Sequence, residues 1–379
     1  MSEKSLFSSL ALGELTLRNR VAMAPMTTWA ANADLTISEA EEAYYRARVG
    51  GVGLVLTGCT QVTANGIGFT DEFAVSDGSF TPSLARLARA AKSGGAPAIL
   101  QIFHAGNKAL PDLAPAGDVV SASAVPVEAS LLAPAQTPRE MTEDEILGII
   151  RAFGDTTRRA IEAGFDGIEL HGAHGFLIQN FFSAASNQRS DSWGGAAENR
   201  MRFAIEVVAE VKRVIAEQAG RPFVLGYRIS PEESGDKGYG IEDSLALVDR
   251  LIDAGISYIH ASLGDVLTNR PATDPQGPTI AERFVTHVDG RVPVIAAGGV
   301  RTPEQAQAAL DLGLSLVAIG RGLVMNPDWV TLAQFGRAAE IATELDPRTV
   351  KEIALPAKLW TVIKATKGWF AIKKVETTS

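Results

Sequence analysis

Eight short apolar segments, each followed by a longer amphipathic segment, constrain the fold of this chain more than any other feature. Short runs of aliphatic and β-branched residues indicate buried strands, and their alternation with segments of helical length predicts βα units and a parallel sheet. The candidate strands are residues 20–24, 52–58, 98–103, 167–171, 223–229, 258–262, 293–297 and 316–320.

The segments between these strands carry the start and stop signals of helices. The segment 142–163 opens on Thr142 with Glu145 three residues later, which is a capping-box pattern, and it ends at Gly164. A helix that ends in glycine just before a strand recurs at Gly255 and Gly313, which indicates one βα unit used repeatedly. The other candidate helices are residues 38–49, 82–92, 198–219, 241–254 and 303–312.

The units follow one another without a Pro/Ser-rich linker or a block of charge between two halves. This continuity favours a closed (β/α)8 TIM barrel over an open doubly wound sheet, so we expect an α/β fold with one barrel domain over residues 1–345. Residues 108–139 are rich in Pro, Ala and Ser, and we expect them to form a long loop after the third strand. Residues 346–379 are expected to form a C-terminal extension that packs on the barrel or on a neighbouring subunit of a homo-oligomer.

Charge and cysteine content exclude several classes of function. The formal net charge of -9 would repel nucleic acid and anionic membranes, which leaves a small molecule as the expected partner. Cys59 is the only cysteine, so no intrachain disulfide and no zinc or iron–sulfur site built from cysteines is possible within one chain. The first residues lack the uninterrupted apolar core of a signal peptide, and no apolar run has the length of a membrane span. These features are typical of a cytoplasmic protein.

The active site of such a barrel forms at the carboxyl ends of its strands, where this chain places few polar residues. His171 and His174 follow the fourth strand, with glycines at 172 and 175 that let both rings face the same mouth. Two imidazoles there suit the binding of an anionic or carbonyl oxygen. Two histidines bonded to each other within the loop are the alternative, and a metal site is less favoured, because the spacing is wrong for strand or helix ligands. The other polar candidates are Thr27, Gln101, Arg228 and Arg321.

The turns after the seventh and eighth strands begin with glycines, at Gly298-Gly299 and at Gly320-Arg321. Such turns commonly bind phosphate in barrels, although tight βα turns alone would also require glycine. Arg228 lies in an otherwise apolar strand, so its charge must be paired. Either the electron-rich edge of a cofactor or the carboxylate of Glu169, one strand earlier, could pair it.

Four segments of the sequence together carry a family resemblance that covers nearly the whole chain. They are residues 15–27, 101–108, 171–175 and 187–200, the last with Trp193-Gly194-Gly195 and Glu198-Asn199-Arg200. In this order they resemble the Old Yellow Enzyme family of FMN-dependent oxidoreductases.

The resemblance implies FMN across the mouth of the barrel and NADH or NADPH as the hydride donor. Residues implied to contact the isoalloxazine are Ala24, Pro25, Met26, Thr27, Cys59, Gln101 and Arg228, with the Thr27 hydroxyl near O4 and Arg228 beside N1 and O2. Gly299, Gly320 and Arg321 are implied to hold the phosphate. His171 and His174 would bind the acceptor as catalytic residues, and ping-pong kinetics would follow.

Two positions depart from the family pattern. The tyrosine that donates a proton to the substrate carbon is replaced by Phe176, which favours acceptors such as quinones, nitro compounds or flavins over activated alkenes. Trp29 stands where a related branch has a substrate-binding tyrosine, so it is a candidate substrate contact. The alternatives are a dihydroorotate-oxidising type of flavin barrel, a metal-dependent barrel hydrolase, and an FMN-binding redox sensor or carrier with little turnover.

Overall fold

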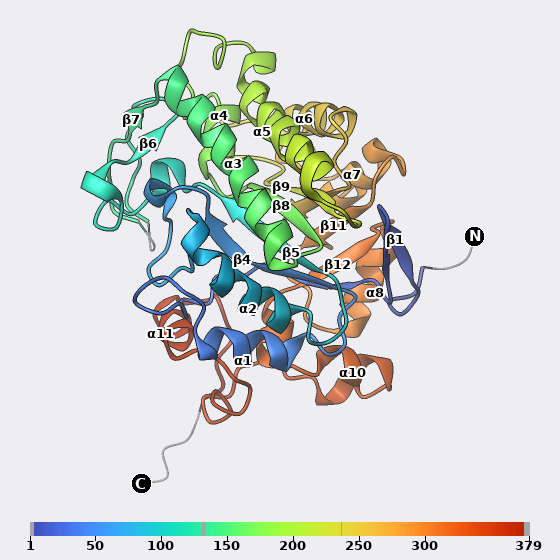
Figure 1. Cartoon of the computed structure of the whole chain (residues 1–379). Coiled ribbons are helices and arrows are strands. Elements are labelled where there is room, and N and C mark those ends of the chain that lie inside the picture. Colours follow the sequence, from blue (N-terminus) through green and yellow to red (C-terminus); the bar gives the residue numbers. More distant parts are fainter. Residues whose placement is uncertain (1–3, 131–132, 236, 375–379) are drawn as a thin grey trace.

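Eight parallel strands form a closed barrel surrounded by helices (Figure 1). The computed structural model describes residues 4–130, 133–235 and 237–374. Around the barrel, neighbouring strands follow the chain order and the last strand pairs with the first. This arrangement confirms the predicted TIM barrel. The strands are β3 (Val21–Met23), β4 (Leu54–Gln61), β5 (Ala98–Phe103), β8 (Gly167–Gly172), β9 (Val224–Ile229), β10 (Tyr258–Ser262), β11 (Val294–Ala297) and β12 (Leu316–Ile319).

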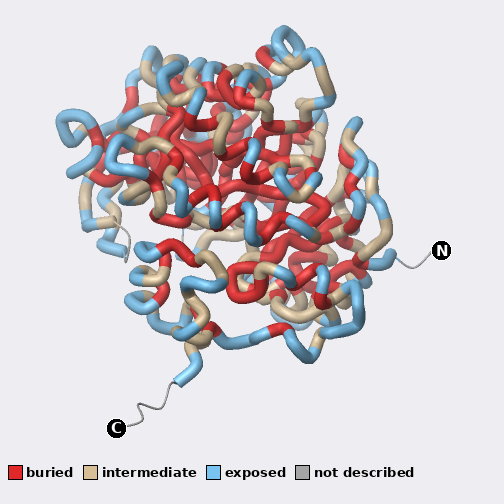
Figure 2. Tube along the Cα trace, turned by 60° about the horizontal axis from the view of Figure 1, so that its bottom comes forward, coloured by how far each residue is buried: buried red, intermediate tan, exposed pale blue. Residues whose placement is uncertain are grey.

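The strands are buried on both faces, which explains their almost continuous apolar sequence. Inward-facing side chains such as Leu56, Ile99 and Ile295 fill the barrel, while a larger apolar cluster lies between the sheet and the helices. In Figure 2 the buried part of the trace runs through the centre of the molecule. An N-terminal hairpin, β1 (Leu10–Leu12) and β2 (Leu15–Leu17), contributes Leu12 and Leu17 to the inner cluster, and the sequence analysis did not predict it.

The six predicted helices are present, and no end is shifted by more than one residue. At the start of α3, the Thr142 hydroxyl accepts from the Glu145 backbone N–H at 3.3 Å and the Glu145 carboxylate accepts from the Thr142 N–H at 2.7 Å. The helix ends at Gly164 with φ 95°, a conformation that favours glycine. The six helices are α1 (Glu39–Arg48), α2 (Thr81–Ala91), α3 (Glu143–Ala163), α5 (Ala197–Gln218), α6 (Ile241–Asp253) and α8 (Pro303–Asp311).

Several elements were missed by the sequence analysis. The helix after β10 begins at a capping box formed by Thr279 and Glu282, a signal that was present in the sequence. Three of the others have only five or six residues, too few for a clear helical periodicity. The missed helices are α4 (Leu177–Phe182), α7 (Ile280–Val288), α9 (Arg321–Met325), α10 (Trp329–Gln334) and α11 (Ala357–Ala365). Of the helices in the described residues, none is both long and apolar enough to cross a membrane.

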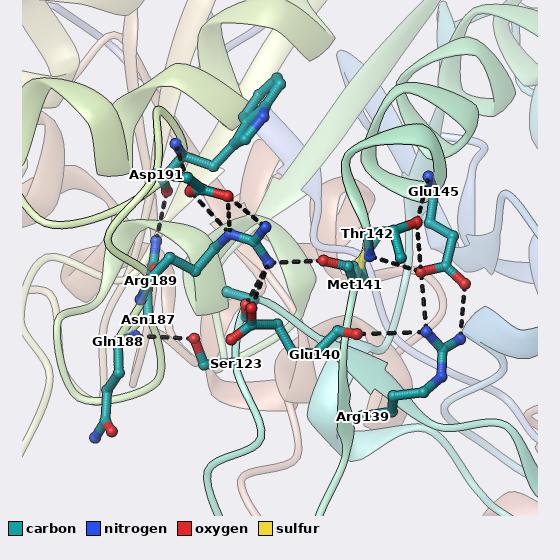
Figure 3. A network of polar contacts seen from close by, with 12 residues as sticks. Ser123, Arg139, Glu140, Met141, Thr142, Glu145, Asn187, Gln188, Arg189 and Asp191 are labelled. Carbon is teal, nitrogen blue, oxygen red and sulfur yellow. Dashed lines mark hydrogen bonds and ion pairs between the residues drawn. The ribbon is translucent and has the colours of Figure 1, made fainter.

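The long loop after β5 contains its own short pairing of β6 (Val120–Ser121) with β7 (Arg139–Glu140), and its residues 131–132 lie outside the described part. Arg189 anchors it: the guanidinium donates to the carbonyl oxygens of Met141 at 2.7 Å and Ala122 at 3.0 Å, and it is paired with Asp191 (Figure 3). Residues 187–200, one of the family-like segments, therefore hold this loop over the barrel.

The chain beyond residue 345 returns to the barrel. Leu345 pairs with Ile372 in an isolated bridge, and the buried guanidinium of Arg48 on α1 donates to the carbonyl oxygen of Ile353 at 2.6 Å. Figure 1 shows α11 close to α1 at the edge of the molecule. The division into a barrel domain (1–345) and an extension (346–379) stays a prediction, and residues 375–379 lie outside the described part.

Candidate active site

A cavity of about 320 Å³ opens at the carboxyl ends of the strands, and we call it the cofactor cavity. Most of the predicted cofactor-binding residues line it together: Ala24, Pro25, Met26, Arg228, Gly299, Gly320 and Arg321. Ser262, Gly298 and Trp369 line it as well. Residues from the beginning, middle and end of the chain thus meet around one space.

The glycine turn after β11 brings the backbone close to the neighbouring loop. Gly298 has φ 153° and Gly299 has φ 72°, both in the region that favours glycine. A Cβ on Gly298 would lie 2.3 Å from the carbonyl oxygen of Leu263, and one on Gly299 would lie 2.6 Å from a carboxylate oxygen of Asp265. A side chain at either position would therefore disrupt this wall of the cavity.

Arg321 supplies positive charge at the same end of the cavity. Burial and the nearby guanidinium of Arg301 hold the pKa of Arg321 below its usual value. One of its N–H groups donates to the backbone oxygen of Trp369 at 2.7 Å, so the chain beyond residue 345 helps to place this side chain. Two close guanidinium groups beside a glycine turn suit an anion such as a phosphate.

Arg228 is a buried part of the cavity wall and has no carboxylate partner among the described residues. One terminal N–H donates to the Ser262 hydroxyl at 3.0 Å, and its Nε–H has no partner. Glu169, the alternative partner considered from the sequence, does not form an ion pair with it. An unpaired N–H of a buried cation is costly, so this geometry favours an electron-rich ligand edge beside Arg228.

The Glu169 carboxylate instead accepts from three side chains inside the barrel. It accepts from Gln101 Nε2 at 2.7 Å, from His260 Nδ1 at 2.9 Å and from the Tyr258 hydroxyl at 3.1 Å. Burial acts to raise the pKa of Glu169, but His260, Arg228 and Gln101 hold it below its usual value. This carboxylate orients the Gln101 amide, because an ionised carboxylate can only accept and so faces the amide nitrogen.

Thr27 and Cys59 lie side by side next to the cofactor cavity, without lining it. The Thr27 hydroxyl is 3.9 Å from the Cys59 sulfur, and Cys59 is opposite Gln101 across β4 and β5. Burial raises the pKa of the Cys59 thiol well above its usual value. Its side chain is therefore a neutral thiol.

His171 and His174 face each other at the end of β8, with ring centroids 4.8 Å apart, and no hydrogen bond joins their rings. Burial, and then neighbouring positive groups, lower the pKa of both imidazoles well below the usual value, so both are neutral. His171 Nδ1 accepts from the Ala173 backbone N–H at 3.3 Å, which leaves the ring hydrogen on Nε2. The second ring is placed differently: His174 has φ 62°, and its Nε2 lies 2.7 Å from the Ser262 hydroxyl.

A second cavity of about 330 Å³, the acceptor cavity, lies beside His174. Phe176, Phe69 and Lys108 line it, and the centroids of the two phenyl rings are 6.2 Å apart. Trp29 does not line it but contacts Phe69 edge to face at 5.7 Å. The same indole lies 6.3 Å from the ring of Trp369, which lines the cofactor cavity. Trp29 therefore stands between the two cavities.

The family model described as "NADH:flavin oxidoreductase / NADH oxidase family" matches residues 5–340. The chain belongs to this family, that of the Old Yellow Enzymes. A probable NADH-dependent flavin oxidoreductase of Bacillus subtilis (strain 168) is 41% identical over 95% of each chain. An NADPH dehydrogenase of Geobacillus thermodenitrificans (strain NG80-2) is 34% identical over 90% of this chain and 96% of its own length. The solved structure of morphinone reductase in complex with tetrahydroNAD matches with a TM-score of 0.75 and 29% identity, covering 88% of this chain and 91% of the other.

This Old Yellow Enzyme is thus an NAD(P)H-dependent flavin oxidoreductase whose cofactor is FMN. The cofactor cavity fits that group in two respects. Arg228 lines the cavity as a buried cation without a carboxylate partner among the described residues, which suits the electron-rich edge of the ring system. The turn at Gly298-Gly299 and the guanidinium of Arg321, which line the cavity together, offer a site for its phosphate.

Sequence reasoning missed several residues of this enzyme's site. Ser262 links Arg228 to His174, and it could have been found because it ends a predicted strand. His260 lies on the same strand, two residues earlier. Lys108 lies within a family-like segment but was given no role. For Trp369, far along the chain from Arg321, the sequence offers no signal.

Proposed function

We propose that the enzyme takes a hydride from NADH or NADPH and passes it to an oxidised acceptor in the acceptor cavity, with both partners using the same site in turn. The observation that carries this proposal is Arg228, which lines the cofactor cavity without a carboxylate partner among the described residues and donates one N–H to Ser262, the hydroxyl that contacts His174. Two successive hydrogen-bond contacts, from Arg228 to Ser262 and from Ser262 to His174, thus join the proposed cofactor and acceptor sites.

Each predicted cofactor residue has a distinct proposed task. Bound FMN supplies a ring system that accepts a hydride from a nicotinamide and gives it up again. Arg228 stabilises negative charge on the reduced ring, and Glu169 holds Gln101 for its pyrimidine edge. Gly299, Gly320 and Arg321 hold the phosphate. The ring system would lie against Ala24, Pro25, Met26, Thr27 and Cys59.

His171 and His174 bind the acceptor oxygen as donors. Both rings are neutral, and His171 presents its Nε2–H. The Ser262 hydroxyl accepts from Arg228 and can donate its own hydrogen to His174 Nε2, which leaves the ring hydrogen of His174 on Nδ1. Two N–H groups directed at one oxygen stabilise the charge that develops there during reduction.

Phe176 narrows the class of acceptor, because its ring cannot donate a proton to carbon. We infer that quinones, nitro compounds or flavins are reduced faster than activated alkenes. Trp29 and Phe176 act as apolar contacts that keep such flat molecules in place, the first through Phe69.

The test is anaerobic titration of the purified, FMN-loaded protein with NADH and with NADPH. Bleaching of the flavin spectrum, followed by rapid reoxidation with a quinone, is expected. Initial rates at varied concentrations of both substrates should give the parallel double-reciprocal lines of a ping-pong mechanism. A protein that binds FMN but consumes nicotinamide at the same negligible rate with and without acceptor would be a redox sensor or carrier, which would refute the proposal.

A further inference from the structure

We propose that Lys108 forms an anion-binding subsite in the acceptor cavity, so that the acceptor is a flat oxidant carrying an anionic substituent such as a carboxylate. The inference rests on the proposed function in one respect, namely that the acceptor occupies this cavity. It adds a chemical class that neither the family nor the histidine pair specifies.

The first support is the position of the ammonium group. Lys108 closes the 3-10 turn Gly106–Lys108 after β5, and its Nζ donates to the backbone oxygen of His174 at 2.6 Å. The same nitrogen lies 6.0 Å from the ring centroid of Phe176. The side chain is thus held against the wall of the acceptor cavity, beside the loop that carries His174.

The second support is the lack of a countercharge. Among the described residues no carboxylate is within ion-pair distance of Lys108, and the carbonyl oxygen of His174 is the one acceptor bonded to Nζ. An ammonium group has three N–H donors, so two are left for a ligand. Burial lowers the pKa of Lys108, an effect that Glu233 only partly offsets. An anion in the cavity would satisfy the charge and reverse this shift.

The third support is the remaining lining of the cavity. Phe69 and Phe176 meet edge to face at an interplanar angle of 78°, and Gly68 and Ala133 add little bulk. A volume of about 330 Å³ suits a ligand of one or two rings. Aromatic walls, the neutral imidazole of His174 and one ammonium group together fit a planar molecule that has a reducible oxygen and a separate negative charge.

A structural role for Lys108 is the competing explanation, because its hydrogen bond to the His174 carbonyl also supports the left-handed backbone of that residue. The two roles differ in one measurable way. Loss of a structural contact would weaken all ligands of the histidine pair alike, whereas loss of a countercharge would weaken only anionic ones.

The experiment compares wild-type protein, Lys108→Gln, Lys108→Arg and the exposed control Lys351→Gln, all loaded with FMN. Binding of 3- and 4-hydroxybenzoate is titrated against the corresponding hydroxybenzamides through the perturbation of the flavin absorbance. Lys108→Gln should raise the Kd of at least one benzoate about 10-fold or more and leave its amide unchanged, because bonds to charged groups have that strength. Lys108→Arg and Lys351→Gln should bind all four ligands like the wild type.

Equal weakening of benzoates and amides would overturn the proposal in favour of the structural role, and unchanged binding of both would also overturn it. If Lys108→Gln does not fold, the salt dependence of ligand binding by the wild-type protein distinguishes the anion-binding role of Lys108 from the structural one. Benzoate binding must then weaken with ionic strength while amide binding does not, and equal behaviour would refute the subsite. Turnover of 4-nitrobenzoate and 4-nitrobenzamide with NADH or NADPH is measured separately. Normal ligand discrimination without turnover would refute the proposed function while the subsite stands.

Discussion

Replacement of Arg228 tests the central electrostatic feature of the site. In Arg228→Met a buried cation that lines the cofactor cavity becomes a shorter apolar side chain, and all N–H donors of the guanidinium are lost. Glu169 keeps its three hydrogen-bond donors but loses one of the positive groups that lower its pKa. The local field at the cavity therefore becomes more negative, which disfavours the reduced, anionic flavin.

The expected change in reduction potential follows from the strength of the lost hydrogen bond to the Arg228 guanidinium. A hydrogen bond to a charged group contributes about 1.5–3 kcal/mol. For a two-electron couple, about 30 mV corresponds to about 1.4 kcal/mol, so the reduction potential should fall by about 30–65 mV. Loss of FMN on dialysis should also increase, because the same contact stabilises binding of the oxidised cofactor.

The potential is measured by anaerobic reduction against an indicator dye, and FMN content is measured after dialysis. Arg228→Lys keeps the positive charge but not the planar set of guanidinium N–H donors. Its reduction potential should therefore shift less than that of Arg228→Met. Arg151→Met, which removes an exposed arginine from α3, serves as the control and should change neither quantity. An unchanged potential together with unchanged FMN content in Arg228→Met would show that this guanidinium does not face the flavin.

Four further substitutions probe the acceptor side and the barrel interior. Phe176→Tyr should speed reoxidation of the reduced enzyme by cyclohexenone about 10²- to 10⁴-fold while changing quinone reduction far less, as followed by stopped flow; a wild type as fast as the variant would show that another acid serves. His171→Ala or His174→Ala should raise the Kd of 4-hydroxybenzaldehyde about 10-fold or more with FMN still bound, and retained affinity would remove the histidines from the acceptor site. Glu169→Gln should lower the free energy of unfolding by about 3 kcal/mol or more in chemical denaturation, because it leaves His260 and Gln101 with a poorer buried acceptor; an unchanged midpoint would contradict this assignment.

Local sequence patterns determined the barrel itself. The periodicity of each strand and helix, and glycines such as Gly164, are properties of short segments, so they can be interpreted without knowing which segments touch. Strand ends were less certain: β4 continues to Gln61, beyond the predicted residue 58, because a bulge between Leu56 and Cys59 lets it go on pairing. The hairpin of β1 and β2 was missed because its short strands derive their stability from the barrel end that they cover.

The sequence named seven of the residues that line the cofactor cavity, but not how the residues around it are connected. Only closure of the barrel brings Ser262 to His174, 88 residues away in the sequence, and His260 to Glu169, 91 residues away. Arg228 illustrates the difference most clearly. The sequence predicted that its charge must be paired and left Glu169 and a cofactor edge as alternatives. The tertiary structure shows no ion pair between Arg228 and Glu169, because three other side chains bond that carboxylate, and a cofactor edge beside Arg228 stays a prediction.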